Sequence, residues 1–301
     1  MMYNIIKPVT YDYNTNKQYI EQLLKEYSFL SAQICGRSVL GRGIFALSVG
    51  NRHNSVIIAA GFHGSEWLTC LTALLFTERL CHCIKNDELL CGIDIRRAFS
   101  QLGVTVIPCV NPDGTEIAVH GPGSAKAMHN FVRNIPCEDY TLWNANAMGV
   151  DINHNFNAGW HTLRQIEQEK GIIGPSMKQF SGEYPESEPE TKALTRLCRT
   201  INFRQCMAVH SQGEELYWHY GENTPKQSGM MAKIIADSCN YTLAEPDTIA
   251  SHGGFKDWFI DEMKRPGFTI EIGKGKNPLP IKDLYKIYAR IEEALTLFCL
   301  C

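Results

Sequence analysis

Residues 56–66 read VIIAAGFHGSE and join a short apolar run to a glycine-containing turn. Five consecutive apolar residues, 56–60, are typical of a strand buried on both faces, as in a parallel sheet. From residue 66 to residue 83, apolar residues recur at helical spacing, so we expect a helix directly after the turn. A buried strand followed at once by a helix indicates an α/β fold.

The same alternation continues along the chain. The apolar, β-branched segment 103–110 predicts another strand, which ends in the turn signal NPDG at residues 111–114. We expect a pair of strands within residues 38–49, around a turn at residues 40–43. Further strands are predicted over residues 204–210 and 267–272, helices over residues 14–27, 188–202, 227–241, 255–263 and 281–299, and a long irregular segment over residues 115–149. The pattern predicts a single α/β domain, residues 1–301, with a mainly parallel sheet.

Composition excludes several function classes. The chain has 29 basic and 32 acidic side chains and a net charge of -3, so it lacks the basic field expected of a nucleic-acid-binding protein. No apolar stretch approaches the roughly 20 residues that span a bilayer, so no membrane partner is expected. The start of the chain does not resemble a secretory signal, and the twelve cysteines lack zinc-finger spacing. We therefore expect reduced thiols and a cytoplasmic location.

Three candidate metal ligands lie at the ends of predicted strands. His63 and Glu66 follow the strand 56–60, and two intervening residues let both side chains face one point as the chain enters its helix. His210 ends the predicted strand 204–210. Because open α/β sheets bind ligands at the carboxyl ends of their strands, we group these three residues. Two histidines and one glutamate with an open position are typical of catalytic zinc, although cobalt or nickel can occupy such a set in vitro.

Each of these motifs also has an ordinary structural interpretation. A glutamate near a histidine is common at the start of a helix, and a histidine at the end of a strand is often only hydrogen-bonded. The combination favours a metal site because it supplies three ligands together. The remaining histidines considered have no partner motif and are expected to be structural or on the surface: His53, His82, His120, His129, His161 and His219.

Glu271 is an acidic residue inside the apolar strand 267–272. Burying an unpaired carboxylate is costly, so this side chain must have a partner or line a cleft. A structural ion pair is the alternative to a catalytic role.

Taken in order, the motifs of this chain resemble those of the zinc carboxypeptidase family, which includes the digestive carboxypeptidases. The matching motifs are HGSE at 63–66, NPDG at 111–114, GVDIN at 149–153, YPESEPE at 184–190, AVHS at 208–211, GG at 253–254 with DW at 257–258, and FTIE at 268–271. The resemblance implies an α/β/α sandwich around a mixed sheet of about eight strands. It also implies one catalytic zinc held by His63, Glu66 and His210, with Glu271 as the general base that moves the proton of the attacking water.

The chain departs from the digestive members where they bind the terminal carboxylate of the substrate. Those members use an Asn-Arg pair, and this chain has Asn153 and His154. Histidine is shorter than arginine and cannot form a bidentate fork. The tyrosine that the digestive enzymes carry upstream of Gly-Gly falls near Ile249 here. Recognition of a terminal carboxylate in the digestive manner is therefore not expected.

A second departure concerns the oxyanion. The digestive enzymes have an arginine in the stretch that matches residues 143–148, WNANAM, which contains no arginine here. Asn146, His154 or a residue such as Arg133 is a candidate to replace it.

These departures resemble most the bacterial γ-D-glutamyl-meso-diaminopimelate peptidase and murein peptide amidase branch. Lys256 matches a position near the bottom of the family's specificity pocket and can pair with a diaminopimelate carboxylate, although a solvated lysine is the alternative. The resemblance implies a small peptide as the partner and recycling of murein peptides in the cytoplasm. The sequence makes no prediction of the oligomeric state.

Three other functions remain open on the sequence alone. An ordinary metallocarboxypeptidase and a related deacylase of N-acyl amino acids can share the fold and the ligands. A module that binds murein peptides without catalysis is favoured only by the missing oxyanion arginine.

Overall fold

The structure, a computed structural model, describes residues 5–245 and 252–301. Within them, eight strands form one mixed sheet in the order β1-β2-β6-β3-β7-β10-β8-β9. The strands are β1 (Ser31–Arg37), β2 (Gly43–Gly50), β3 (Ser55–Ala60), β6 (Gly103–Ile107), β7 (Cys206–His210), β8 (Glu215–Tyr217), β9 (Thr242–Leu243) and β10 (Gly267–Glu271), and β4 (Leu89–Leu90) pairs separately with β5 (Ile93–Asp94).

The four central strands, β6, β3, β7 and β10, run parallel to one another. Strand β2 runs antiparallel to β1 and to β6, and β8 runs antiparallel to β10. The predicted fold class, a single α/β/α domain around a mixed sheet of eight strands, is confirmed. Because the central strands are parallel, their carboxyl ends meet at one edge, and the polar residues that follow them are brought together there.

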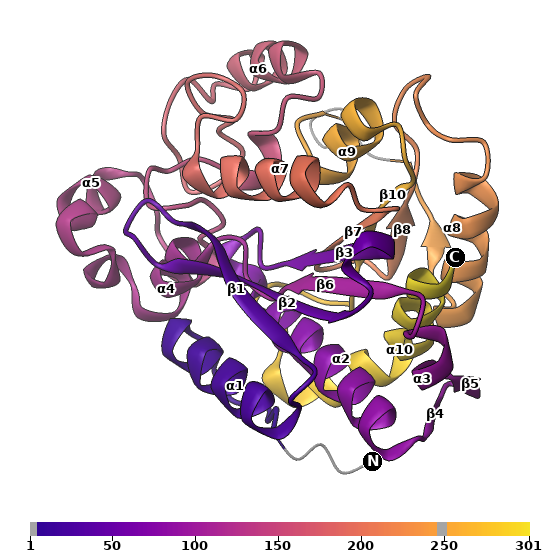
Figure 1. Cartoon of the computed structure of the whole chain (residues 1–301). Coiled ribbons are helices and arrows are strands. Elements are labelled where there is room, and N and C mark those ends of the chain that lie inside the picture. Colours follow the sequence, from indigo (N-terminus) through magenta and orange to yellow (C-terminus); the bar gives the residue numbers. More distant parts are fainter. Residues whose placement is uncertain (1–4, 246–251) are drawn as a thin grey trace.

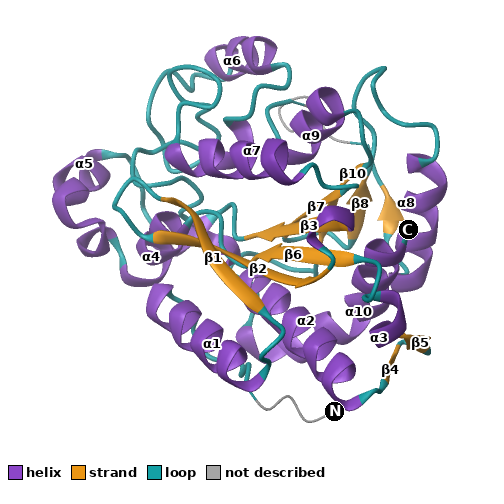
Figure 2. Cartoon of the chain, viewed as in Figure 1, coloured by secondary structure: helices purple, strands orange, loops and turns teal. Residues whose placement is uncertain are grey.

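Helices cover both faces of the sheet, as Figure 2 shows. In Figure 1, α1, α2, α8 and α10 lie on one side, and α7 and α9 lie on the other. The helices are α1 (Tyr13–Glu26), α2 (Trp67–Asn86), α3 (Ile95–Ala98), α4 (Pro112–His120), α5 (His129–Asn134), α6 (Trp160–Glu169), α7 (Pro189–Ile201), α8 (Ser228–Cys239), α9 (Phe255–Met263) and α10 (Leu284–Leu300).

Successive residues of each central strand contribute to two different cores. Ile58 and Val209 belong to the apolar cluster that packs against α2 and α10. Ile57 and Ala208 belong to the cluster formed with α7 and α9. This alternation follows from the two-residue period of a strand. Full burial of each large aliphatic side chain contributes roughly 1.5–3 kcal/mol, so the central strands are firmly fixed where they carry site residues.

Three local predictions were wrong. The segment 115–149, predicted to be irregular, contains most of α4 and all of α5. The NPDG segment was expected to be a turn, but Pro112 begins helix α4 and the Asn111 side chain accepts a hydrogen bond from the backbone N–H of Gly114. An asparagine followed by a proline is typical of the start of a helix as well as of a turn, so these residues alone did not distinguish the two. The first strand of the predicted pair lies earlier than expected, at β1, because residues 38–42 form the turn that connects β1 to β2.

Candidate metal centre and substrate pocket

The chain turns sharply after β3 to place His63 and Glu66 at the edge of the sheet. Gly61 adopts a φ of +65°, and a Cβ on Gly64 would lie 2.2 Å from the carbonyl oxygen of Gly114, so both positions require glycine. Glu66 then ends a short 3-10 turn, Gly64–Glu66, immediately before α2. His63 Nδ1 lies 2.7 Å from Glu66 Oε1.

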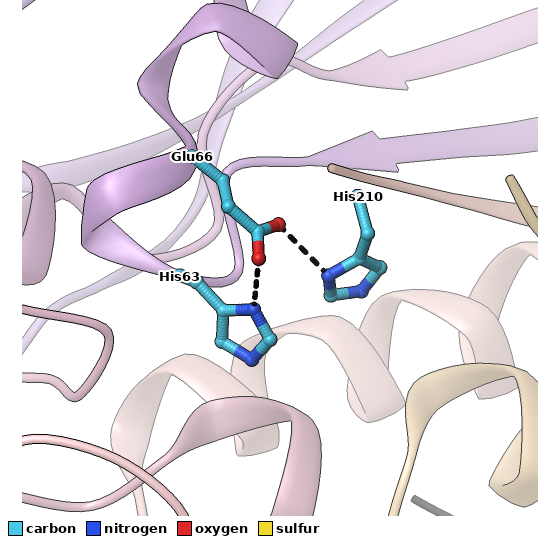
Figure 3. Close-up of side chains that lie close together, drawn as sticks. All are labelled: His63, Glu66 and His210. Carbon is cyan, nitrogen blue, oxygen red and sulfur yellow. Dashed lines mark hydrogen bonds and ion pairs between the residues drawn. The ribbon is translucent and has the colours of Figure 1, made fainter. Parts of the chain in front are cut away.

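His210 joins these two residues from the carboxyl end of β7. Its Nδ1 lies 3.1 Å from Glu66 Oε2, and its ring stacks on Phe62 with a centroid separation of 5.0 Å. Figure 3 shows the Glu66 carboxylate between the two imidazoles. The candidate ligand atoms of His63, Glu66 and His210 all lie within 4.8 Å of one another. The structure thus brings together the three residues that were grouped from the sequence.

Asp151, which lies in the GVDIN motif, is a further candidate site residue that was not predicted from the sequence. Its Oδ1 lies 3.0 Å from His63 Nε2, and its Oδ2 accepts a hydrogen bond from the backbone N–H of Gln179. A buried carboxylate beside one ring nitrogen of histidine holds the proton on that nitrogen and leaves the other free to bind a metal. The available signal was an acidic residue two positions before Asn153 in the GVDIN motif.

The electrostatics of the cluster match those of a cation site. Burial alone would lower the pKa of His63, but the charges of Glu66 and Asp151 outweigh burial and raise it well above the usual value. Burial alone would raise the pKa of Glu66, but His63 and His210 lower it to about 2. Burial lowers the pKa of His210. The cluster therefore holds a carboxylate that stays ionised and needs positive charge between its oxygens and the imidazoles.

The hydrogen-bonding capacity of the cluster leads to the same conclusion. When Asp151 accepts the Nε2 proton of His63, Nδ1 presents a lone pair to Glu66 Oε1, and two acceptors repel at this distance unless a cation or a proton lies between them. His210 Nε2 is buried and has no partner among the described residues. Two imidazoles and one carboxylate are a common donor set for catalytic zinc, so the residues present fit a divalent ion.

Glu271 ends β10, in register with His210 on β7 and with Glu215 on β8. Burial raises its pKa well above the usual value, and the charge of Glu66 raises it further. The side chain lines a pocket at this edge of the sheet. The other residues that line this pocket are Asn153, Tyr217, Gly254, Lys256, Asp257 and Thr269.

Two of the four predicted substrate-binding residues, Asn153 and Lys256, line this pocket together with Glu271. The Asn153 side chain also accepts a hydrogen bond from the backbone N–H of Phe255, at the first residue of α9. Lys256 is buried, and its ammonium donates to the backbone carbonyl of His219 at 2.9 Å and to Asp257 Oδ1. Lys256 is therefore not the solvated surface lysine that was its alternative.

The other two residues, His154 and Asn146, are not among the residues that line this pocket. His154 is buried with its Nδ1 3.1 Å from Glu167 Oε1. Asn146 is fully buried, and its amide nitrogen donates to Glu188 at 2.7 Å and to Glu190 at 3.2 Å. Both side chains thus fix loops through contacts with residues distant in the sequence.

One further candidate from the sequence, Arg133, lies elsewhere. Arg133 is exposed on α5, and Ile249 lies outside the described residues. His120 forms a second group with Asp12 and Glu116. The carboxylates of that group already accept hydrogen bonds from backbone N–H groups, of Thr15 and Tyr13.

Comparison with known proteins agrees with the geometry of the cluster. The family model described as zinc carboxypeptidase matches residues 16–293. This chain belongs to the zinc carboxypeptidase family. It is therefore a metallopeptidase, and the family implies zinc as the cofactor and a peptide as the substrate.

Two curated bacterial relatives align over most of the chain. The gamma-D-glutamyl-L-diamino acid endopeptidase 1 of Lysinibacillus sphaericus is 33% identical over 96% of this chain and 71% of its own length. The uncharacterized protein YqgT of Bacillus subtilis is 32% identical over 92% of this chain and 74% of its own length.

Solved structures share the fold. Thrombin activatable fibrinolysis inhibitor superimposes with a TM-score of 0.76 at 19% identity, covering 97% of this chain and 74% of that chain. The murein-tripeptide amidase MpaA from Escherichia coli O157 superimposes with a TM-score of 0.55 at 20% identity, covering 89% of this chain and 91% of that chain. At these identities the likeness concerns the fold alone.

Two further observations concern the helices and the cysteines. None of the helices among the described residues is long and apolar enough to cross a bilayer. All twelve cysteines are free.

Proposed function

We propose that this metallopeptidase hydrolyses the bond between a γ-D-glutamyl residue and a diamino acid, meso-diaminopimelate, in murein peptides of the cell wall. The observation that carries the proposal is the convergence of His63, Glu66, His210 and Glu271 at one edge of the sheet, next to a charged pocket. The relative from Lysinibacillus sphaericus, named for this bond, supports the choice of substrate.

In the proposed site, His63, Glu66 and His210 hold one zinc ion. When bound, the ion polarises the scissile carbonyl and lowers the pKa of a water molecule. Asp151 keeps the proton of His63 on Nε2, so that Nδ1 faces Glu66 and the ion. Phe62 packs flat on His210 and limits rotation of its ring.

Glu271 acts as the general base. It takes the proton of the attacking water and delivers it to the leaving amine. Burial and the charge of Glu66 raise the pKa of this carboxyl, so it binds a proton more tightly than an exposed glutamate does. A base of this kind can both accept and return the proton during one turnover.

The residue after Asn153 supports a substrate other than an ordinary C-terminal residue. The position after Asn153, occupied by the carboxylate-binding arginine in digestive relatives, holds His154, whose ring pairs with the buried Glu167. We infer that Asn153 and Lys256 contact the substrate, whereas Asn146 and His154 position the loops around them. The free thiols favour a reducing compartment, and we place the reaction in the cytoplasm.

The test is incubation of the zinc-loaded protein with L-alanyl-γ-D-glutamyl-meso-diaminopimelate, with products read by mass spectrometry. We expect L-alanyl-D-glutamate and free diaminopimelate from the native protein and no products from Glu271→Gln. Ordinary peptides with C-terminal lysine or leucine and N-acetyl amino acids serve as comparison substrates. Faster hydrolysis of either comparison group, with the murein peptide intact, would refute the proposed substrate.

A further inference from the structure

Two buried cysteines lie against the turn that carries His63 and Glu66. A Cβ placed on Gly61, in that turn, would lie 2.5 Å from Cys70 Sγ and 3.2 Å from Cys109 Sγ. Both sulfur atoms therefore lie within 3.2 Å of one point, although no bond joins them. Cys70 is fully buried near the start of α2, and Cys109, which follows β6, is 3% exposed. Thiols this close to each other can form a disulfide bond.

The surroundings of the pair favour Cys109 as the thiol that reacts first. Burial raises the pKa of Cys70 well above the usual value, and the contact with Cys109 raises it further. Burial alone would raise the pKa of Cys109, but its contacts with Cys70 and Thr115 lower it. The Tyr11 hydroxyl is buried beside both thiols, has no other partner among the described residues, and can donate to a thiolate. The thiolate is the nucleophile in thiol oxidation.

Hydrogen bonds connect both cysteines to the metal-binding turn. The hydroxyl of Thr69, next to Cys70 in the chain, accepts from the backbone N–H of Gly61 at 3.1 Å. It also donates to the backbone carbonyl of Glu66 at 2.7 Å. Two residues after the second cysteine, the backbone N–H of Asn111 donates to the carbonyl of Gly61 at 2.9 Å. A bond that brings the two sulfurs to about 2 Å therefore moves the groups that hold this turn from both sides.

We propose that Cys70 and Cys109 form a reversible disulfide bond when a hydroperoxide reaches them, and that this bond weakens metal binding by the neighbouring cluster. The inference goes beyond the proposed function, because it does not depend on which peptide the enzyme cleaves. Since the pair is buried, the oxidant must be small. A hydroperoxide meets this condition, whereas a bulky disulfide such as oxidised glutathione does not.

The reaction takes place in two steps. The Cys109 thiolate attacks one oxygen of the hydroperoxide, an S–O bond forms and the O–O bond breaks; the other oxygen takes the proton that Cys109 released and leaves as an alcohol, or as water from hydrogen peroxide. The Cys70 sulfur then attacks the sulfenic acid, the S–S bond forms, and the hydroxyl leaves as water with the proton of Cys70. Two thiols thus lose two electrons, and one hydroperoxide gains them.

The test is exposure of the zinc-loaded protein to hydrogen peroxide, followed by blocking of free thiols, digestion with trypsin and mass spectrometry without reductant. Cleavage after lysine and arginine places the two cysteines on separate peptides, residues 53–79 and 98–126, and neither peptide contains another cysteine. We expect these two peptides to be linked. We also expect zinc affinity, measured by chelator competition, to fall roughly 10–100-fold, the range for a disturbed support of metal ligands. Dithiothreitol should reverse both changes.

Three variants show whether the pair is responsible. Cys70→Ala and Cys109→Ala each remove one partner and should keep the same zinc affinity before and after peroxide. Cys198→Ala removes an equally buried cysteine on α7 and is the matched control, which should respond as the native protein does. Because the peptide map is made on the native protein, the test does not depend on the folding of any variant.

Three results would overturn the inference. The first is oxidation of the exposed Cys91 and Cys301 while Cys70 and Cys109 remain reduced. The second is formation of the linked peptides without a change in zinc affinity. The third is an equal loss of zinc affinity in Cys70→Ala, which would show that peroxide acts elsewhere. None of these results bears on the peptide bond that the enzyme cleaves, so the proposed function is tested separately.

Discussion

Glu190 makes the free energy of unfolding depend on pH, and the size of this dependence follows from the pKa of its side chain. The side chain is fully buried in the first turn of α7, where Oε1 accepts from the backbone N–H of Val39 at 3.0 Å and Oε2 accepts from Asn146 at 3.2 Å. Burial, followed by the charge of Asp113, raises its pKa to about 8 from an ordinary value of 4.5. The folded protein therefore holds a proton on Glu190 at neutral pH that the unfolded chain releases.

The sign of the pH dependence follows from this difference. Between pH 4.5 and pH 8, the folded state binds more protons at this site than the unfolded state, so its contribution to the free energy of unfolding falls as the pH rises. The contribution is fully present below pH 4.5 and is lost by the time the pH exceeds 8. At about 1.4 kcal/mol per pH unit, the interval from pH 4.5 to pH 8 lowers the free energy of unfolding by roughly 4–5 kcal/mol as an upper limit.

Glu190→Gln replaces the carboxyl by a neutral group of nearly the same shape and removes this dependence. Glutamine cannot accept from both Val39 and Asn146 through one oxygen, so we expect a loss of about 1 kcal/mol near pH 4.5. Near pH 9 the variant should be more stable than the native protein by a few kcal/mol. The measurement is urea unfolding followed by tryptophan fluorescence at pH 4.5, 6, 7.5 and 9. Glu183→Gln makes the same chemical change at an exposed position and is the control.

The difference between the native protein and Glu190→Gln is the quantity to follow, because the titrations of all other groups cancel in it. A difference that stays constant over the whole pH range would show that Glu190 has the same proton affinity in the folded and unfolded states. That result would refute the reasoning from burial and from the neighbouring Asp113.

Three further predictions concern the metal cluster and the amino-terminal segment. Glu271→Gln should retain zinc, measured by atomic absorption, while kcat falls by roughly 10²–10⁴-fold; loss of both would indicate a ligand instead. Asp151→Asn should weaken zinc binding about 10–100-fold in a chelator competition, with the fold intact by circular dichroism, and unchanged affinity would show that its contact with His63 has no effect on the metal. Glu78 accepts from the backbone N–H groups of Ile5 and Ile6, so Glu78→Gln should increase amide hydrogen exchange at these two residues, and equal exchange in both proteins would contradict the contact.

The site residues that could be predicted from the sequence share one property. Each follows a strand that can be predicted from its own apolar residues. His63, His210 and Glu271 each lie at the end of a short apolar run, and parallel strands place such ends on the same edge. The order of the strands in the sheet could not be predicted, because β3 pairs with β7 across more than 140 residues of intervening chain. Their proximity was inferred from the chemistry of the residues, and the structure bears it out.

The residues whose surroundings could not be predicted lie in loops, where partners are chosen by tertiary contacts. Asn146 and His154 occupy motif positions that suggested substrate contact. Their hydrogen bonds go to Glu188 and Glu167, and the spacing of the motifs contains no information about either partner. Asp151 was overlooked for the same reason, since its role depends on where a loop places it relative to His63.

The metal cluster and the pocket differ in how their charges are compensated, and this difference separates the general reaction from the particular substrate. In the cluster, Glu66 lies between His63 and His210, and Asp151 contacts the far nitrogen of His63, so the ring nitrogens and carboxylate oxygens that face one another are satisfied once one cation is present. In the pocket, Lys256 and Asp257 compensate each other's charge directly, and the Lys256 ammonium also donates to the carbonyl oxygen of His219 and lies over the ring of Tyr220. The chemistry common to the family thus depends on a cluster that needs a cation, and the proposed choice of substrate depends on the pocket beside it.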